Sequence, residues 1–87
     1  MKNKYKYEYI NMGNEIVAVP VGENASQLSG ILKLNQEGFD ILEILGDDVT
    51  EEHIVKILEK KYQDNSISIS NYVHNFIEKL RRNELID

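Results

Sequence analysis

Hydrophobic and polar side chains alternate along the first part of the chain, and this alternation predicts a strand. Over residues 4–11 the tyrosines at positions 5, 7 and 9 share one face, and charged side chains share the other. A period of two is typical of a half-buried strand, and tyrosine favours that conformation. We therefore expect the tyrosines to face the protein core.

The positions that follow predict a hairpin and a third strand. Gly13-Asn14 is a turn signal of the kind that joins antiparallel strands, and a return strand rich in Val and Ile follows at 15–21. Pro20 has no N–H to donate to a ladder, so we expect this strand to end there or to lie at an edge. A short apolar run at 30–34 predicts the third strand.

Beyond that run the apolar period changes to that of helices. Asn35 is a strong N-cap for a helix predicted at 36–45, and Gly46 is expected to close this helix in the left-handed conformation. Thr50 is the expected cap of a second helix at 50–62.

The third helix is predicted at 70–83, after a polar loop at 63–68, with Ser70 or Ser68 as its cap. A chain of 87 residues is the size of one small domain, which we place at 1–87. The elements together predict an α+β fold in which a three-stranded antiparallel sheet is followed by three helices.

Composition excludes several classes of protein. The chain has no cysteine, so it has no disulfide framework and no thiolate zinc site. No apolar run approaches the roughly 20 residues that a membrane span requires, and the basic, tyrosine-rich N-terminus does not resemble a signal peptide. We therefore expect a cytoplasmic protein without membrane contact.

The charge pattern argues against nucleic acid as a partner. The net charge is −5, and residues 34–55 contain acidic side chains but no Lys or Arg. Such an acidic flank repels a phosphate backbone. The tyrosine face would also suit base stacking, and Lys79, Arg81 and Arg82 would suit a recognition helix. Core packing explains the tyrosines, however, and a helix dipole alone attracts cations to a C-terminus.

No group of residues predicts catalysis, a metal or a cofactor. His53 and His74 have no third ligand at a suitable spacing. The glycines are isolated rather than grouped in a phosphate loop, and the serines have no neighbouring base. We expect a protein that is not an enzyme.

Three segments, taken in order, resemble the PqqD family, the peptide chaperone of pyrroloquinoline quinone biosynthesis, and more broadly the RiPP precursor peptide recognition element (RRE). The segments are GILKLNQEG at 30–38, VTEEHI at 49–54 with Leu58 and Tyr62, and the helix from Val73 to Leu80 that precedes Leu85-Ile86. The family often has glycine just before that last pair, where this chain has Asn83-Glu84. The resemblance covers about residues 4–86 and implies a winged helix-turn-helix-like fold.

The resemblance also implies a function. Members of this family bind the leader region of a ribosomally synthesised precursor peptide, which adds as a strand to the edge of the third strand and lies against the third helix. A separate maturation enzyme receives the peptide: a radical S-adenosylmethionine enzyme in the PqqD case, a protease or cyclase in other systems. The residues so assigned to peptide binding are Gly30, Ile31, Leu32, Lys33, Leu34, Tyr72, Phe76, Lys79, Arg82 and Asn83.

Charge and shape give some of these residues specific tasks in that picture. Lys33, Lys79 and Arg82 are expected to meet acidic leader side chains, and Gly30 allows a close backbone approach. On the third helix, Tyr72 and Phe76 lie on a stripe next to the one expected to face the core.

Two other functions fit the same fold class. One is a winged-helix DNA-binding regulator, against which the acidic balance and the scattered cations argue. The other is a small protein–protein scaffold that would use the same strand edge for a folded partner. Because an exposed edge also pairs with a second copy, both a monomer and a homodimer stay open.

Overall fold

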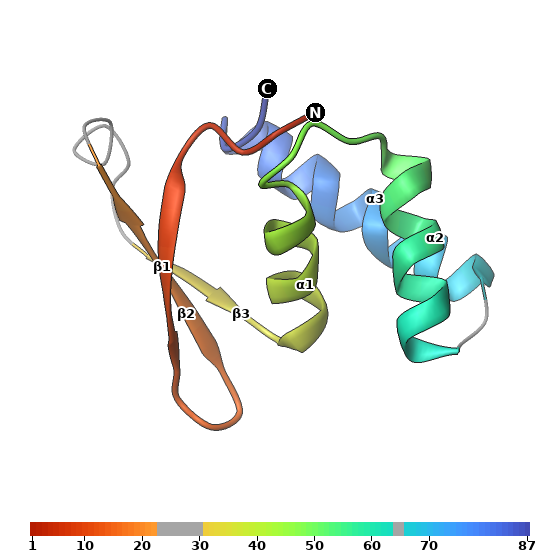
Figure 1. Ribbon diagram of the computed structural model, residues 1–87, viewed down its shortest axis with the longest axis horizontal. Coiled ribbons are helices and arrows are strands. Elements are labelled where there is room, and N and C mark those ends of the chain that lie inside the picture. The colour runs from red at the N-terminus through yellow and green to blue at the C-terminus, as the bar shows by residue number, and fades with distance from the viewer. Residues whose placement is uncertain (23–30, 64–65) are drawn as a thin grey trace.

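A small sheet and three helices lie side by side in the protein (Figure 1). The structure is a computed structural model, and it describes residues 1–22, 31–63 and 66–87. The elements are β1 (Lys6–Asn11), β2 (Ile16–Val21), β3 (Leu32–Leu34), α1 (Gln36–Ile44), α2 (Glu51–Tyr62) and α3 (Ser66–Arg82). The predicted α+β fold of three antiparallel strands followed by three helices is confirmed, in agreement with a winged-helix arrangement. None of the helices in these ranges has the length and apolar character that crossing a membrane requires.

The sheet is antiparallel in the order β1-β2-β3. The predicted turn at Gly13-Asn14 is confirmed: the Met12 N–H donates to the Glu15 carbonyl oxygen at 2.8 Å. Gly13 adopts a φ of 88°, which glycine reaches without steric penalty.

The prediction that the return strand ends at Pro20 or lies at an edge is right only in part: β2 ends at Val21, the residue after Pro20, but it is the central strand. In an antiparallel ladder, hydrogen-bonded and non-hydrogen-bonded pairs alternate. The pair of Met12 with Glu15 is hydrogen-bonded. Alternating from there along β1 and β2 makes the pair of Tyr7 with Pro20 a non-hydrogen-bonded one. The ladder with β1 therefore loses no hydrogen bond at this proline.

The core lies between the inner face of the sheet and the three helices. The three tyrosines of the first strand region pack against it from the edge of the sheet, as predicted. The buried apolar cluster consists of Ile16, Ala18, Leu34, Ile41, Leu42, Leu45, Ile54, Leu58, Ile69, Val73, Ile77, Leu80, Leu85 and Ile86.

Two of the three predicted N-caps form, whereas the prediction of Ser70 or Ser68 as the third is wrong, because both serines lie inside α3. Asn35 Oδ1 accepts from the Gly38 N–H at 2.9 Å, and Thr50 Oγ1 accepts from the His53 N–H at 3.1 Å. The prediction for Gly46 is wrong, because this glycine does not take a left-handed conformation. Its N–H donates to the Glu43 carbonyl at 3.1 Å, a tightened last turn that closes the helix without a positive φ.

Helix α3 begins at Ser66, earlier than the predicted start at residue 70. Part of the predicted loop 63–68 is therefore helical. Ile69 lies four residues before Val73 and is 8% exposed, so it extends the apolar stripe by one turn. Burial of that isoleucine outweighs the modest helix propensity of the serines around it.

Glu84 forms the turn that follows α3 and precedes the last apolar pair. Glu84 adopts a φ of 57°, and the Leu85 N–H donates to the Leu80 carbonyl at 2.9 Å. This turn places Leu85 and Ile86 in the core, where Ile86 also pairs with Asn3.

Replacing Glu84 by glycine is expected to stabilise the protein. A left-handed φ costs a residue with a Cβ about 1–2 kcal/mol, and part of this gain is offset by the greater freedom of glycine in the unfolded chain. Glu84→Gly should raise the free energy of unfolding by about 0.5–1 kcal/mol in urea denaturation. Glu84→Ala is the control, since it removes the carboxylate but keeps the Cβ. Equal stabilities of the Gly and Ala variants would contradict the prediction.

Candidate functional site

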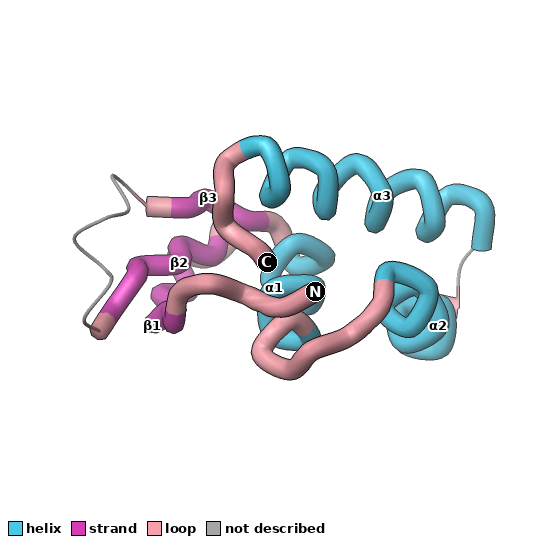
Figure 2. Tube along the Cα trace, turned by 90° about the horizontal axis from the view of Figure 1, so that it is seen from above, coloured by secondary structure: helices cyan, strands magenta, loops and turns pink. Residues whose placement is uncertain are grey.

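β3 is an edge strand that borders β2 on one side and has no strand on its other side within the described ranges. Figure 2 shows β3 next to α3, with β1 on the opposite side of the sheet. The free edge of β3 therefore faces the space along α3.

The register determines which backbone groups of β3 point to that free edge. The pairs of Leu32 and Leu34 with β2 are hydrogen-bonded ones, because they continue the alternation that starts at the Met12–Glu15 bond. The pair between Lys33 and Val17 is non-hydrogen-bonded. The N–H and C=O of Lys33 accordingly point outward, available to an added strand.

Two adjoining hollows of about 460 and 590 Å³ form a groove between β3 and α3. Four residues line both hollows: Lys33, Leu34, Phe76 and Lys79. The groove thus has a strand edge on one wall and a helix face on the other, the shape that an extended peptide fills.

Most of the residues predicted from the sequence line this groove. They are Ile31, Leu32, Lys33 and Leu34 from the strand region, and Tyr72, Phe76, Lys79 and Asn83 from α3. Gly30 lies outside the described residues. Arg82 is exposed and does not line either hollow, because it lies away from the helix stripe that carries Phe76 and Lys79.

Several lining residues were not identified from the sequence. Asn75 lies four residues before Lys79 on α3, so helical spacing was the signal that could have found it. No local signal pointed to the others, which come from the hairpin turn, the chain before β1, the cap of α1, the end of α3 and the turn after α3. These are Asn14, Glu15, Tyr5, Asn35, Leu80, Glu84 and Leu85.

Positive charges lie at the middle of the groove, and negative charges lie in the two hollows on either side. Lys33 and Lys79 are exposed and shared by the two hollows. One carboxylate lies in each hollow, that of Glu15 in the first and that of Glu84 in the second. The shared region of the groove is therefore cationic, although the whole chain is acidic.

The helix wall of the groove is held by contacts to the start of α1. The Tyr72 hydroxyl donates to Asn35 Oδ1 at 2.9 Å, and the Tyr72 and Phe76 rings stack with centroids 6.1 Å apart. A Cβ on Gly38 would approach Phe76 Cε2 to 2.9 Å, so any larger residue at this position would force the ring to shift. Burial raises the pKa of Tyr72, so the phenol stays a neutral donor.

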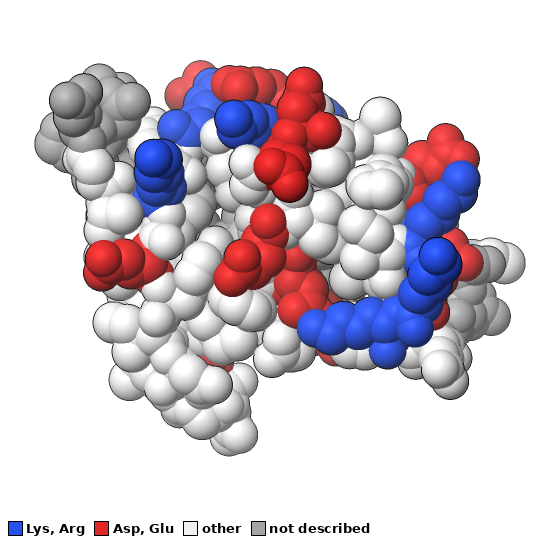
Figure 3. Space-filling model, viewed as in Figure 1, with Lys and Arg blue, Asp and Glu red and all other residues white. Residues whose placement is uncertain are grey.

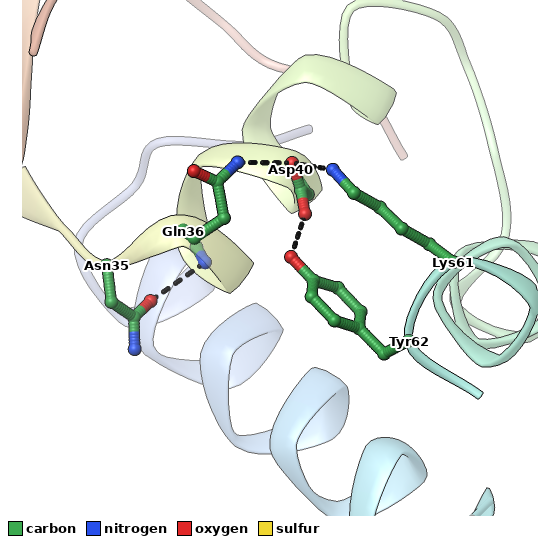
Figure 4. Close-up of polar contacts among 6 residues, drawn as sticks. Asn35, Gln36, Asp40, Lys61 and Tyr62 are labelled. Carbon is green, nitrogen blue, oxygen red and sulfur yellow. Dashed lines mark hydrogen bonds and ion pairs between the residues drawn. The ribbon is translucent and has the colours of Figure 1, made fainter. Parts of the chain in front are cut away.

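A buried carboxylate joins α1 to α2 beside this wall (Figure 4). Asp40 is 7% exposed and accepts hydrogen bonds from Gln36 Nε2 at 3.0 Å, Lys61 Nζ at 2.9 Å and the Tyr62 hydroxyl. Burial opposes ionisation of Asp40, but the three hydrogen bonds and the Lys61 charge outweigh it and hold the pKa below its ordinary value. Burial and the Asp40 carboxylate raise the pKa of Tyr62.

The described residues offer little support for metal binding or for a cluster of free surface charges. They contain no group of three or more His, Cys, Asp or Glu side chains that could hold a metal ion. His74 lies 3.3 Å from Glu51 on the surface, and Arg81 is paired with Glu78 at 2.6 Å. The arrangement that this region presents is an unpaired strand edge beside an aromatic and cationic helix face.

Comparisons with known proteins agree with this geometry. The family model described as coenzyme PQQ synthesis protein D (PqqD) matches residues 15–86. A solved structure titled "TbiB1 in Complex with the TbiA(beta) Leader Peptide" superposes with a TM-score of 0.74 at 20% sequence identity, over 100% of this chain and 95% of TbiB1. No curated protein sequence gives a significant match.

Proposed function

Because the chain belongs to the PqqD family, we propose that it is a non-catalytic module that binds the leader region of a ribosomally synthesised precursor peptide and presents it to a separate maturation enzyme. The leader adds to the sheet as a fourth strand beside β3 and rests on α3. The observation that most directly supports this proposal is the unpaired backbone of Lys33. It faces a groove that is lined on its far side by Phe76 and Lys79. TbiB1, which shares the fold, is described in complex with a leader peptide, and this supports the proposal.

The groove suggests how side chains of the leader divide between two surfaces. Successive side chains of an added strand point to opposite faces of the sheet. Those on the inner face meet Phe76, Tyr72 and Lys79, and those on the outer face lie alongside Lys33. We therefore expect a leader with a bulky apolar residue for the aromatic wall and acidic residues for the two lysines.

The proposal is tested by an amide NMR titration of the labelled protein. The ligand is a synthetic leader from a short peptide encoded beside the gene for this chain. We expect the shifts to concentrate at Ile31 and Lys33 and along α3 from Tyr72 to Asn83. If no such leader perturbs these amides while duplex DNA or a folded partner does, the proposed function is overturned.

Reversing the charge of Lys79 is expected to weaken the binding of an acidic leader by about threefold to tenfold. A partly exposed ion pair contributes about 0.2–1 kcal/mol, and the reversal adds repulsion. The free energy of unfolding should change by less than about 0.5 kcal/mol, because Lys79 is exposed. Isothermal titration calorimetry measures the affinity of Lys79→Glu.

Arg82→Glu is the matched control, since Arg82 lies on the same helix but outside the groove. Its effect on affinity should stay below about twofold, from long-range charge alone. Equal losses from Lys79→Glu and Arg82→Glu would mean that net charge rather than the groove attracts the leader.

A further inference from the structure

The sheet has a second free edge, on β1. The pairs of Tyr7 and Tyr9 with β2 are non-hydrogen-bonded ones, by the same alternation that orients Lys33. Their backbone N–H and C=O groups therefore point away from β2, and no other described strand pairs with them. β1 has six residues, whereas the described β3 has three, so this edge is the longer one.

A hollow of about 540 Å³ lies along this edge, between β1 and the C-terminal half of α1. Tyr7 and Tyr9 line its sheet side, and Glu43 lines its helix side. The edge and the hollow repeat on β1 the combination of strand edge and helix wall that β3 forms with α3. The residues of this β1 groove are different from those of the β3 groove, apart from Tyr5.

Hydrogen bonding is incomplete in the lining of the β1 groove. Two buried side-chain atoms of the described residues have no hydrogen-bond partner, Asn3 Oδ1 and the Tyr7 hydroxyl, and both residues line this groove. Folded domains leave few buried polar atoms unpaired. The β1 groove is therefore the region where the described chain alone satisfies its polar groups least well.

The charge of the β1 groove selects the kind of partner. Three exposed lysines line it, Lys2, Lys4 and Lys6, against the single carboxylate of Glu43. Burial and that carboxylate raise the pKa of Tyr9 to about 12, so the phenol adds no charge at neutral pH. Figure 3 shows the molecule from the side on which β1 lies in front, and there the cationic side chains (blue) lie among acidic ones (red). A second copy of the chain would bring the same lysines to the edge, whereas an acidic segment would be attracted.

We propose that the free edge of β1 and the groove beside α1 bind an extended acidic segment of another protein by strand addition. The segment pairs with the backbone of Tyr7 and Tyr9, and its carboxylates meet Lys4 and Lys6. The β3 edge stays free, so a leader and this second partner bind at the same time.

The test is an amide NMR titration with two blocked synthetic peptides of equal length, one alternating glutamate with valine and the other alternating lysine with valine. The glutamate peptide should shift the amides of Tyr7 and Tyr9, with an affinity about tenfold higher than that of the lysine peptide and falling as salt rises. The double variant Lys4→Glu/Lys6→Glu should reverse this preference.

Lys56→Glu/Lys60→Glu on α2 is the matched control, because it reverses the same number of exposed lysines away from the β1 groove. It should leave the response of Tyr7 and Tyr9 unchanged. The inference is overturned if the glutamate peptide does not shift these amides, or if both peptides shift them equally. It is also overturned if the amides shift with protein concentration alone, which would indicate that a second copy binds. The leader titration is scored on Ile31 and Lys33, so failure of either proposal is visible separately.

Discussion

Lys33→Pro is expected to weaken leader binding by about 10- to 100-fold while leaving the fold intact. Proline removes the one outward-facing N–H of the described β3, and the leader carbonyl that it would pair with then stays unsatisfied, at about 1–3 kcal/mol. Proline is tolerated on an edge strand where the N–H faces solvent, so the ladder with β2 keeps its hydrogen bonds. Calorimetric titration with the leader and thermal unfolding followed by circular dichroism measure the two quantities.

Two neighbouring substitutions separate backbone from side chain in this test. Lys33→Ala keeps the N–H and loses only the ammonium group, so its affinity should fall by no more than about fivefold. Leu32→Pro removes an N–H that points to β2, so it should destabilise the protein itself. If Lys33→Pro binds the leader as tightly as Lys33→Ala, the leader does not pair with this edge.

Asp40→Ala is expected to lower the free energy of unfolding by about 2–4 kcal/mol. The substitution leaves the Tyr62 hydroxyl and the Gln36 amide without their acceptor beside the core, and it removes a charged hydrogen bond to Lys61. Lys61 is half exposed and can return to water, which keeps the loss below that of a fully buried pair. Urea denaturation at neutral pH measures the difference. Glu43→Ala, which removes an exposed carboxylate of the same helix, should change stability by less than about 0.5 kcal/mol.

The contribution of Asp40 should also depend on pH in a defined direction. Its pKa is lowered in the folded protein, so the unfolded chain binds this proton more readily. The stabilisation is fully present above the ordinary aspartate pKa of about 3.9 and is lost as pH falls through the folded value. The difference in stability between the wild type and Asp40→Ala should be constant from neutral pH to about pH 5 and should shrink below about pH 4. A difference that stays constant in acid would show that the lost packing, and not the carboxylate, explains the variant.

Local features of the fold were predictable because each depends on residues close together in the chain. The caps at Asn35 and Thr50 form because a short polar side chain reaches an N–H three residues away. The tyrosine alternation and the helical stripe ending at Leu80 set the faces that enter the core. The early start of α3 could not be predicted from local pattern. Burial of Ile69 stabilises the first turn only when α3 packs against the rest of the core.

The groove beside β3 was predictable in part. Tyr72, Phe76 and Lys79 share a helix stripe, so their joint position followed from spacing. Arg82 could not be separated from Lys79 by charge, because only the orientation of α3 against the sheet places one in the groove and the other outside it. Glu15 belongs to a distant turn and carried no signal of its own.

The kinds and order of the elements, the N-caps of α1 and α2 and the buried faces could therefore be predicted, since they follow from propensity and from contacts within a few residues. Three features depend on how the strands pair: β2 is central, the backbone of Lys33 points outward and that of Leu32 inward, and β1 keeps a second free edge. Strand order and register come from pairing across the chain, where a shift by one residue turns every backbone group and side chain to the opposite side. That choice is made by the packing of the whole core.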